Sequence, residues 1–169
     1  MARGVGGTVL ELTDEPAEAD VAALVAGLMA FNEPHLGRSD FRRLGVLARR
    51  QGRLAGGLVG ETGRGFLFVD LLWVAEEARK SGLGSRLLAA AEGEALRRGC
   101  HAAWLDTYDF QARPFYERHG YRVFGELDGF PGGHRRFYLA KRLAGPADRA
   151  SRNGPATPPR SPGRATGRP

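Results

Sequence analysis

A short cationic loop with two glycines, RKSGLG at residues 79–84, narrows most what this chain can fold into. It follows an apolar run at residues 66–74 and precedes a leucine- and alanine-rich run whose apolar residues share one helical face. Glycine adopts left-handed backbone angles and has no Cβ, so an anion can approach closely, and the first N–H groups of a helix are free to bind it. The loop therefore predicts a phosphate-binding site between a strand and a helix.

The apolar patterns along the chain predict alternating strands and helices. Seven strands are predicted, over residues 7–12, 44–50, 53–61, 66–74, 101–108, 121–127 and 134–143. Three helices are predicted, over residues 16–30, 83–96 and 112–120, and a loop or short helical turns over residues 31–43. Short glycine-containing turns join the second to fourth strands and suit an antiparallel meander, whereas a helix before the fifth strand predicts a parallel pair. The pattern indicates an α/β fold with a mixed seven-stranded sheet.

The composition limits the class of protein. With 169 residues, 42% of them hydrophobic, the chain is expected to form one soluble domain over residues 1–144. The most apolar stretch, residues 21–31, is shorter than the roughly 20 residues of a membrane span, so we expect a cytoplasmic protein without membrane contact. A single cysteine, Cys100, excludes an internal disulfide and a thiolate zinc cluster. Histidine spacing suited to a metal and a G-x-S-x-G motif are both missing, so neither a metalloenzyme nor a serine hydrolase is expected.

The last 25 residues, 145–169, differ in composition from the rest. They hold five arginines and one aspartate, which gives +4 of the total net charge of +6, together with six prolines and no large apolar residue. Such a segment cannot bury enough surface to offset the entropy of ordering, so it is predicted to be a disordered tail. An inert extension and weak attraction to RNA, DNA or anionic lipid are the two interpretations.

Three phosphate-binding designs compete for the RKSGLG loop. A P-loop needs a lysine and then serine or threonine after its last glycine, but Gly84 is followed by Ser85 and Arg86. A dinucleotide fingerprint would place its third glycine where Leu87 stands. The third design is R-x-x-G-x-G before a long helix, with F-Y-x-x-x-G-Y about thirty residues downstream. Its members here are Arg79, Gly82, Gly84, Phe115, Tyr116, Gly120 and Tyr121.

With these two motifs, residues 8–143 resemble the GNAT superfamily of N-acetyltransferases. The resemblance implies acetyl-CoA as co-substrate, a pyrophosphate held by backbone amides of the loop, and a sheet splayed between its fourth and fifth strands to admit pantetheine. The residues that it assigns to CoA are Leu72, Val74, Arg79, Lys80, Ser81, Gly82, Leu83, Gly84, Ser85 and Phe115. It also makes the amides around Leu72 and Val74 oxyanion donors. Asp109 departs from the family pattern, in which many members carry asparagine.

Two side chains are candidates for the chemistry. The resemblance makes Tyr116 the general acid that protonates the departing thiolate, and the alternative is that it only packs against Phe115. Asp70 is the one charged residue in an apolar strand, where an unpaired buried carboxylate is costly. It is expected to act as the base, directly or through water, or to form a salt bridge with an arginine.

The acceptor of the acetyl group is left open by the sequence. Asn32, Glu33, His35 and His134 are candidates to line its pocket, against the alternative of solvated loop residues, whereas His101 and His119 are expected to be structural. A small-molecule primary amine is the expected acceptor, and a protein lysine or N-terminus is the alternative. A non-catalytic CoA-binding module and a nucleic-acid-associated protein acting through the tail are the rival functions, and a homodimer is left open.

Overall fold

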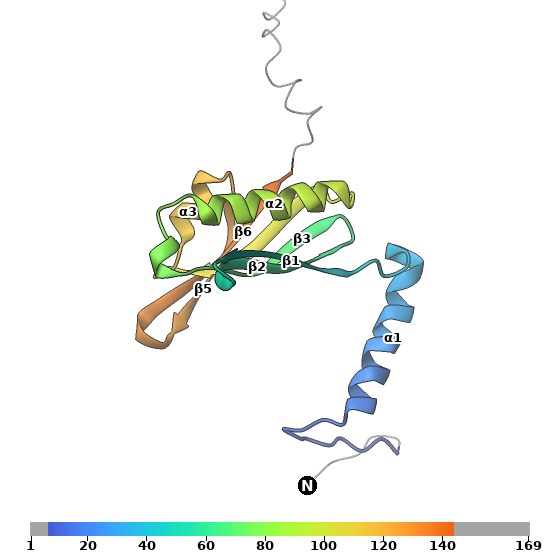
Figure 1. The fold of residues 1–169 in the computed structure, drawn as a ribbon. Coiled ribbons are helices and arrows are strands. Elements are labelled where there is room, and N and C mark those ends of the chain that lie inside the picture. Colours follow the sequence, from blue (N-terminus) through green and yellow to red (C-terminus); the bar gives the residue numbers. More distant parts are fainter. Residues whose placement is uncertain (1–6, 144–169) are drawn as a thin grey trace, which may run out of the picture. The chain divides into compact units, whose positions relative to one another are not determined.

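The computed structural model describes residues 7–143 (Figure 1), so the predicted tail at 145–169 lies outside the described residues. The chain divides after Phe41 into two compact units. In chain order, the elements are α1 (Glu18–Leu36), β1 (Arg42–Arg50), β2 (Arg53–Gly63), β3 (Phe66–Val74), the 3-10 turn η1 (Glu76–Ala78), α2 (Leu83–Arg97), β4 (Ala102–Tyr108), α3 (Arg113–Arg118), β5 (Arg122–Phe130), the 3-10 turn η2 (Pro131–Gly133) and β6 (His134–Arg142). The prediction of a single domain over residues 1–144 stays a prediction.

The first unit contains α1. This helix ends at Leu36, and the N–H of the following Gly37 donates to Glu33 O at 2.9 Å. Of the loop or short helical turns predicted over residues 31–43, residues 31–36 are thus helical and continue α1. Pro34 lies in the last turn, where its missing N–H removes only one intrahelical hydrogen bond. Within this unit the apolar face of α1 is exposed, as in Leu24 and Leu28.

The second unit is built on a mixed sheet with the strand order β1-β2-β3-β4-β6-β5. The sheet has six strands, so the prediction of seven is wrong by one, because residues 9–12 form no strand and Val9, Leu10 and Leu12 are exposed. An alternating run becomes a strand only where a neighbouring strand pairs with its backbone. The antiparallel meander β1-β2-β3 and the parallel pair β3-β4 are as predicted.

Helix α2 lies across one face of this sheet (Figure 1). Most of its predicted apolar stripe is buried in the core that it forms with the strands. Leu87, Leu88, Ala91 and Ala95 of the helix are buried against strand residues such as Leu58. Cys100 is buried in the same core, as expected of a small apolar side chain. The core therefore fixes where the first turn of α2, and with it the RKSGLG loop, lies relative to β3.

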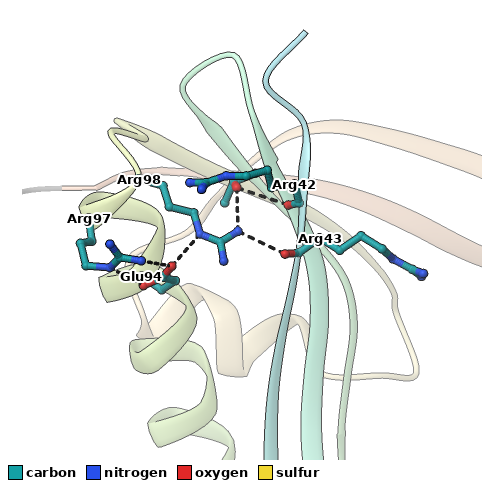
Figure 2. Close-up of polar contacts among 6 residues, drawn as sticks. Arg42, Arg43, Glu94, Arg97 and Arg98 are labelled. Atoms are coloured by element: carbon teal, nitrogen blue, oxygen red, sulfur yellow. Dashed lines mark hydrogen bonds and ion pairs between the residues drawn. The ribbon is translucent and has the colours of Figure 1, made fainter.

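Arg98 ties the other end of α2 to the sheet (Figure 2). The Arg98 guanidinium donates to Glu94 at 2.6 Å, to the hydroxyl of Thr62 at 3.0 Å and to the carbonyl of Arg43 at 3.2 Å. Arg97 donates two hydrogen bonds of 2.7 Å to the same Glu94 carboxylate. The hydrogen bonds from Arg97, and next in size the one from Arg98, lower the pKa of Glu94 to about 2. The helix is thus held at both ends relative to β1 and β2.

The sheet is splayed between β3 and β4, the fourth and fifth strands of the prediction. Their parallel pairing runs from Phe66 opposite Ala102 to Val69 opposite Leu105 and stops there, although β3 continues to Val74. The splay predicted from the family resemblance is therefore confirmed. It leaves a gap between two neighbouring strands at their carboxyl ends, where α/β sheets commonly bind ligands.

A β-bulge in β3 lies at the point where the splay begins. Gly60 of β2 pairs with Val69 and Val59 pairs with Leu71, so Asp70 is an extra residue without an opposite partner. A Cβ on Gly60 would lie 2.2 Å from the carbonyl oxygen of Phe68, so only glycine fits beside the bulge. Bulges redirect side chains, and this one leaves Asp70 exposed in a strand that is otherwise apolar.

Candidate active site

The RKSGLG loop presents a row of free backbone amides at the start of α2. The N–H of Arg79 donates to Glu76 O, and the N–H of Arg86 donates to Gly82 O at 3.1 Å. Within the described chain, no backbone carbonyl accepts a hydrogen bond from the N–H groups of residues 80–85. The positive end of the helix dipole adds to these donors, so the loop has the physical properties of an anion site.

The backbone conformation at Gly82, the first glycine of the loop, favours glycine. Gly82 has φ of 76°, a left-handed conformation that a side chain would strain, and a Cβ there would meet nothing within 4 Å. A Cβ on Gly84 would instead lie 3.5 Å from the ring of Phe115 and 3.8 Å from Val74. A methyl group fits at residue 84, whereas a branched side chain would have to displace Phe115.

Several side chains of the loop are already engaged with the protein. The Arg79 Nε atom donates to Val74 O at 3.3 Å, and the Ser81 hydroxyl donates to Ala78 O at 2.7 Å. The Ser85 hydroxyl lies 3.0 Å from Nε2 of His119, whose Nδ1 lies 2.8 Å from Phe115 O. Ser81 and Ser85 therefore offer a ligand their backbone amides, and His119 is structural as predicted.

A groove of about 690 Å³ runs from the loop to the splay. Its lining includes all the predicted CoA-binding residues except Ser81, which is not part of the wall. The lining residues not anticipated from the sequence are Trp73, Ala78, Phe110, Gln111, Ala112 and Arg118. Most of these come from the segment after β4, and the only signal that could have indicated them was their position at the carboxyl end of that strand.

A second cavity, of about 200 Å³, lies in the splay itself and brings the two predicted catalytic residues together. Asp70 and Tyr116 both line it, and Asp106 of β4 joins them. Leu72, Gln111 and Ala112 line both this cavity and the groove, so the two spaces adjoin. Asp106 forms an ion pair with Arg136 at 2.5 Å.

The two candidate groups differ in their surroundings. Tyr116 is 7% exposed. Its burial, and to a lesser extent the nearby charge of Asp106, raise its pKa to about 12. Its phenol is therefore protonated at neutral pH and can donate a proton. Asp70 is exposed and forms no ion pair within residues 7–143, which argues against the salt bridge that was its alternative role.

The four predicted acceptor residues lie in both units. Asn32, Glu33 and His35 belong to α1 in the first unit, in a helix where a loop was expected. His134 begins β6 in the second unit, and its Nδ1 atom lies 2.9 Å from the Asp109 carboxylate. Their role in binding an acceptor stays a prediction.

The described residues hold no group of three or more histidine, cysteine, aspartate or glutamate side chains that could bind a metal ion. Among the helices within residues 7–143, none has the length and apolar character needed to cross a membrane.

The chain is similar to known acetyltransferases in both sequence and structure. The model of the acetyltransferase (GNAT) family matches residues 10–121. An acetyltransferase of Agrobacterium fabrum is 42% identical over 117 residues, which cover 69% of this chain and 85% of that protein. The blasticidin-S acetyltransferase of Streptomyces morookaense is 48% identical over 94 residues, 55% of this chain and 69% of that protein. The crystal structure of an acetyltransferase from Bacillus cereus superposes with a TM-score of 0.71 at 30% identity, over 79% of this chain and 98% of that one.

Proposed function

The chain belongs to the GNAT family of acetyltransferases, and we propose that it transfers the acetyl group of acetyl-CoA to the nitrogen of a small-molecule primary amine. One observation carries this proposal. The amide-lined loop at residues 79–85 opens into a groove that ends at a cavity between two splayed strands, and that cavity holds an exposed carboxylate and a protonated phenol.

The residues along the groove fit acetyl-CoA. The free amides of residues 80–85 suit the pyrophosphate, and the guanidinium of Arg79 and the ammonium of Lys80 add positive charge on the groove wall. Leu72 and Val74 of β3, opposite Ala112 and Phe115, provide mostly apolar walls between the loop and the splay. In this proposal acetyl-CoA supplies the thioester, and the thioester binds in the splay cavity that Asp70 and Tyr116 line.

The two groups divide the proton transfers. Asp70 accepts a proton from the ammonium of the acceptor, directly or through water, so that the nitrogen lone pair is free to attack the acetyl carbon. A bond forms between that nitrogen and the acetyl carbon, and the carbon–sulfur bond breaks. Tyr116 donates its phenolic proton to the sulfur that leaves, because a phenol with a pKa of about 12 is fully protonated before the step. The nitrogen loses a second proton as the amide forms, and this proton restores the Tyr116 phenol, so the net reaction releases only the proton taken by Asp70.

A small-molecule acceptor is supported by one relative. The protein from Streptomyces morookaense is named for acetylation of blasticidin S, and 48% of 94 aligned residues are identical to it.

The test is a thiol-release assay with acetyl-CoA and a panel of acceptors. The panel contains blasticidin S, simple primary amines, and a peptide with one lysine and a free N-terminus. Thiol release with small amines and only background release with the peptide is the expected result. Release that depends on the peptide alone would overturn the small-molecule acceptor. Binding of acetyl-CoA without release in the presence of any acceptor would overturn the transferase function.

A further inference from the structure

A third cavity, of about 340 Å³, lies beside the groove and is walled mainly by rings. Tyr108, Phe110, Phe130, Pro131 and His134 line it. The Tyr108 ring stacks on Phe110 with 5.2 Å between centroids, and Phe130 meets Tyr108 edge to face at 5.1 Å. His134 meets Phe110 edge to face at 4.7 Å. The cavity, called the aromatic pocket below, is within the range of about 300–1,000 Å³ that is usual for small-molecule sites.

Hydrogen bonds to the Asp109 carboxylate hold part of the wall of the aromatic pocket in place. Asp109 accepts hydrogen bonds from the N–H of Phe110 at 2.8 Å and of Arg135 at 3.3 Å, and its Oδ1 atom lies 2.9 Å from Nδ1 of His134. Although partial burial acts against it, the bonds from His134 and these amides lower the pKa of Asp109. The residue after β4 is thereby fixed to the start of β6. The His134 ring and the backbone of Phe110 are thus held in position before any ligand binds, which reduces the entropy lost on binding.

The charges around the aromatic pocket are balanced in pairs. Asp109 faces His134, Arg135 pairs with Glu126 at 2.9 Å, and Arg136 pairs with Asp106. The guanidinium of Arg136 also lies 5.4 Å from the centroid of the Tyr108 ring. None of the described residues that line the pocket is an arginine, lysine, aspartate or glutamate, so its wall offers no such ion-pair partner to a charged group. Its stacked and edge-on rings favour a flat, uncharged ring instead.

The position of the aromatic pocket separates it from the path of CoA. The groove continues into the splay cavity through Leu72, Gln111 and Ala112, whereas the aromatic pocket shares only Phe110 with the groove. No residue of the loop at 79–85 lines the aromatic pocket. A CoA bound along the groove would leave this pocket for a different molecule.

We propose that the aromatic pocket binds a flat, unsaturated ring of the acceptor, so that the enzyme prefers primary amines that carry such a ring. This inference rests on the proposed function, because the ammonium of the same acceptor is placed near Asp70 in the splay cavity. Phe110 and Phe130 stack on the ring, and Nε2 of His134, which makes no hydrogen bond within residues 7–143, is available to a polar atom on its edge.

The first test compares two amines that differ only in the flatness of the ring, 2-phenylethylamine and 2-cyclohexylethylamine. For the wild-type protein, kcat/KM for the phenyl compound should exceed that for the cyclohexyl compound by roughly 3- to 10-fold. In Phe130→Leu, which keeps an apolar side chain but removes the flat face, the ratio should fall to about one, with the KM for acetyl-CoA unchanged. The matched control is Phe124→Ala, because Phe124 is an exposed aromatic residue of the same strand outside the pocket, and it should keep the wild-type ratio.

The second test measures ring binding without catalysis. Saturation-transfer NMR should show transfer to the ring protons of 2-phenylethylamine with the wild-type protein and with Phe124→Ala. Phe130→Ala should show no transfer, and its melting transition should be retained, which shows that the variant is folded. Equal kcat/KM for the two amines overturns this inference and leaves the acetyltransferase function intact. A raised KM for acetyl-CoA in Phe130→Leu would assign the pocket to CoA and also overturn it. If neither amine is acetylated, the NMR result alone decides: transfer that is lost in Phe130→Ala supports ring binding, and absence of transfer with the wild-type protein overturns it.

Discussion

Replacing Tyr116 by phenylalanine removes one hydroxyl from the splay cavity and leaves the ring in place. The ring packs edge to face on Phe115 with centroids 5.1 Å apart and on Tyr121 at 5.9 Å, and both contacts survive the substitution. Within the described chain the Tyr116 hydroxyl makes no hydrogen bond to a protein group, so its loss should change the free energy of unfolding by less than about 1 kcal/mol.

The effect on turnover should be much larger. A general acid typically contributes about 10²- to 10⁴-fold, or roughly 3 to 5 kcal/mol of transition-state free energy. Because burial raises the pKa of Tyr116 to about 12, the wild-type rate should also show no alkaline decline from this group up to about pH 10. We expect kcat of Tyr116→Phe to fall by about 10²- to 10⁴-fold while the affinity for acetyl-CoA is retained.

The assay is steady-state thiol release with an accepted amine, together with calorimetric titration of acetyl-CoA. Tyr121→Phe is the matched control, because Tyr121 is a neighbouring buried tyrosine that lies in the core and does not line the cavity. Near-normal kcat in Tyr116→Phe would refute the proton-donor role and leave Tyr116 as a packing residue. An equal loss of kcat in both variants would show that the effect is structural.

Three other perturbations have defined outcomes. Gly82→Val forces a β-branched residue to φ of 76° in the loop, so acetyl-CoA should no longer raise the melting temperature, and an unchanged shift would contradict the anion site. Asp70→Asn should lose activity mainly at low pH and recover part of it at high pH, where the amine loses its proton unaided; a profile of unchanged shape would exclude Asp70 as the base. Glu94 has its pKa lowered from 4.5 to about 2, so Glu94→Gln should be less stable than wild type above about pH 5, and the difference should shrink as the pH falls toward 2; a difference independent of pH in urea unfolding would refute this.

Most of the sheet could be predicted from the sequence because its signals are local. The strand at 66–74 was predicted at the bounds found, and the next helix was predicted with the start found at Leu83, because clear periodicity and glycine-rich breaks mark them. The prediction of a strand at residues 7–12 was wrong because a strand also depends on a partner that is not local in the sequence. Alternation in so short a run shows only that it could be a strand, and a pairing partner elsewhere in the chain decides whether it is one.

The candidate site was only partly predictable. The loop and Tyr116 belong to motifs with fixed spacing, and Asp70 was noticeable as a charge among apolar residues. The bulge that exposes Asp70 depends on Gly60 in another strand, and no pattern within either strand reveals that pairing. Likewise, Phe130 joins Tyr108 in one pocket only because β6 folds back beside β4.

The central claim is the transfer of an acetyl group from acetyl-CoA directly to an amine bound at the splay. A single-turnover reaction, with the protein in excess over acetyl-CoA and followed by mass spectrometry of both the amine and the intact protein, tests it most directly. The account predicts one acetylated amine for each thiol released, with no acetylated protein at any time. Thiol release that leaves the amine unchanged, or an acetyl group found on the protein before it reaches the amine, would contradict the account.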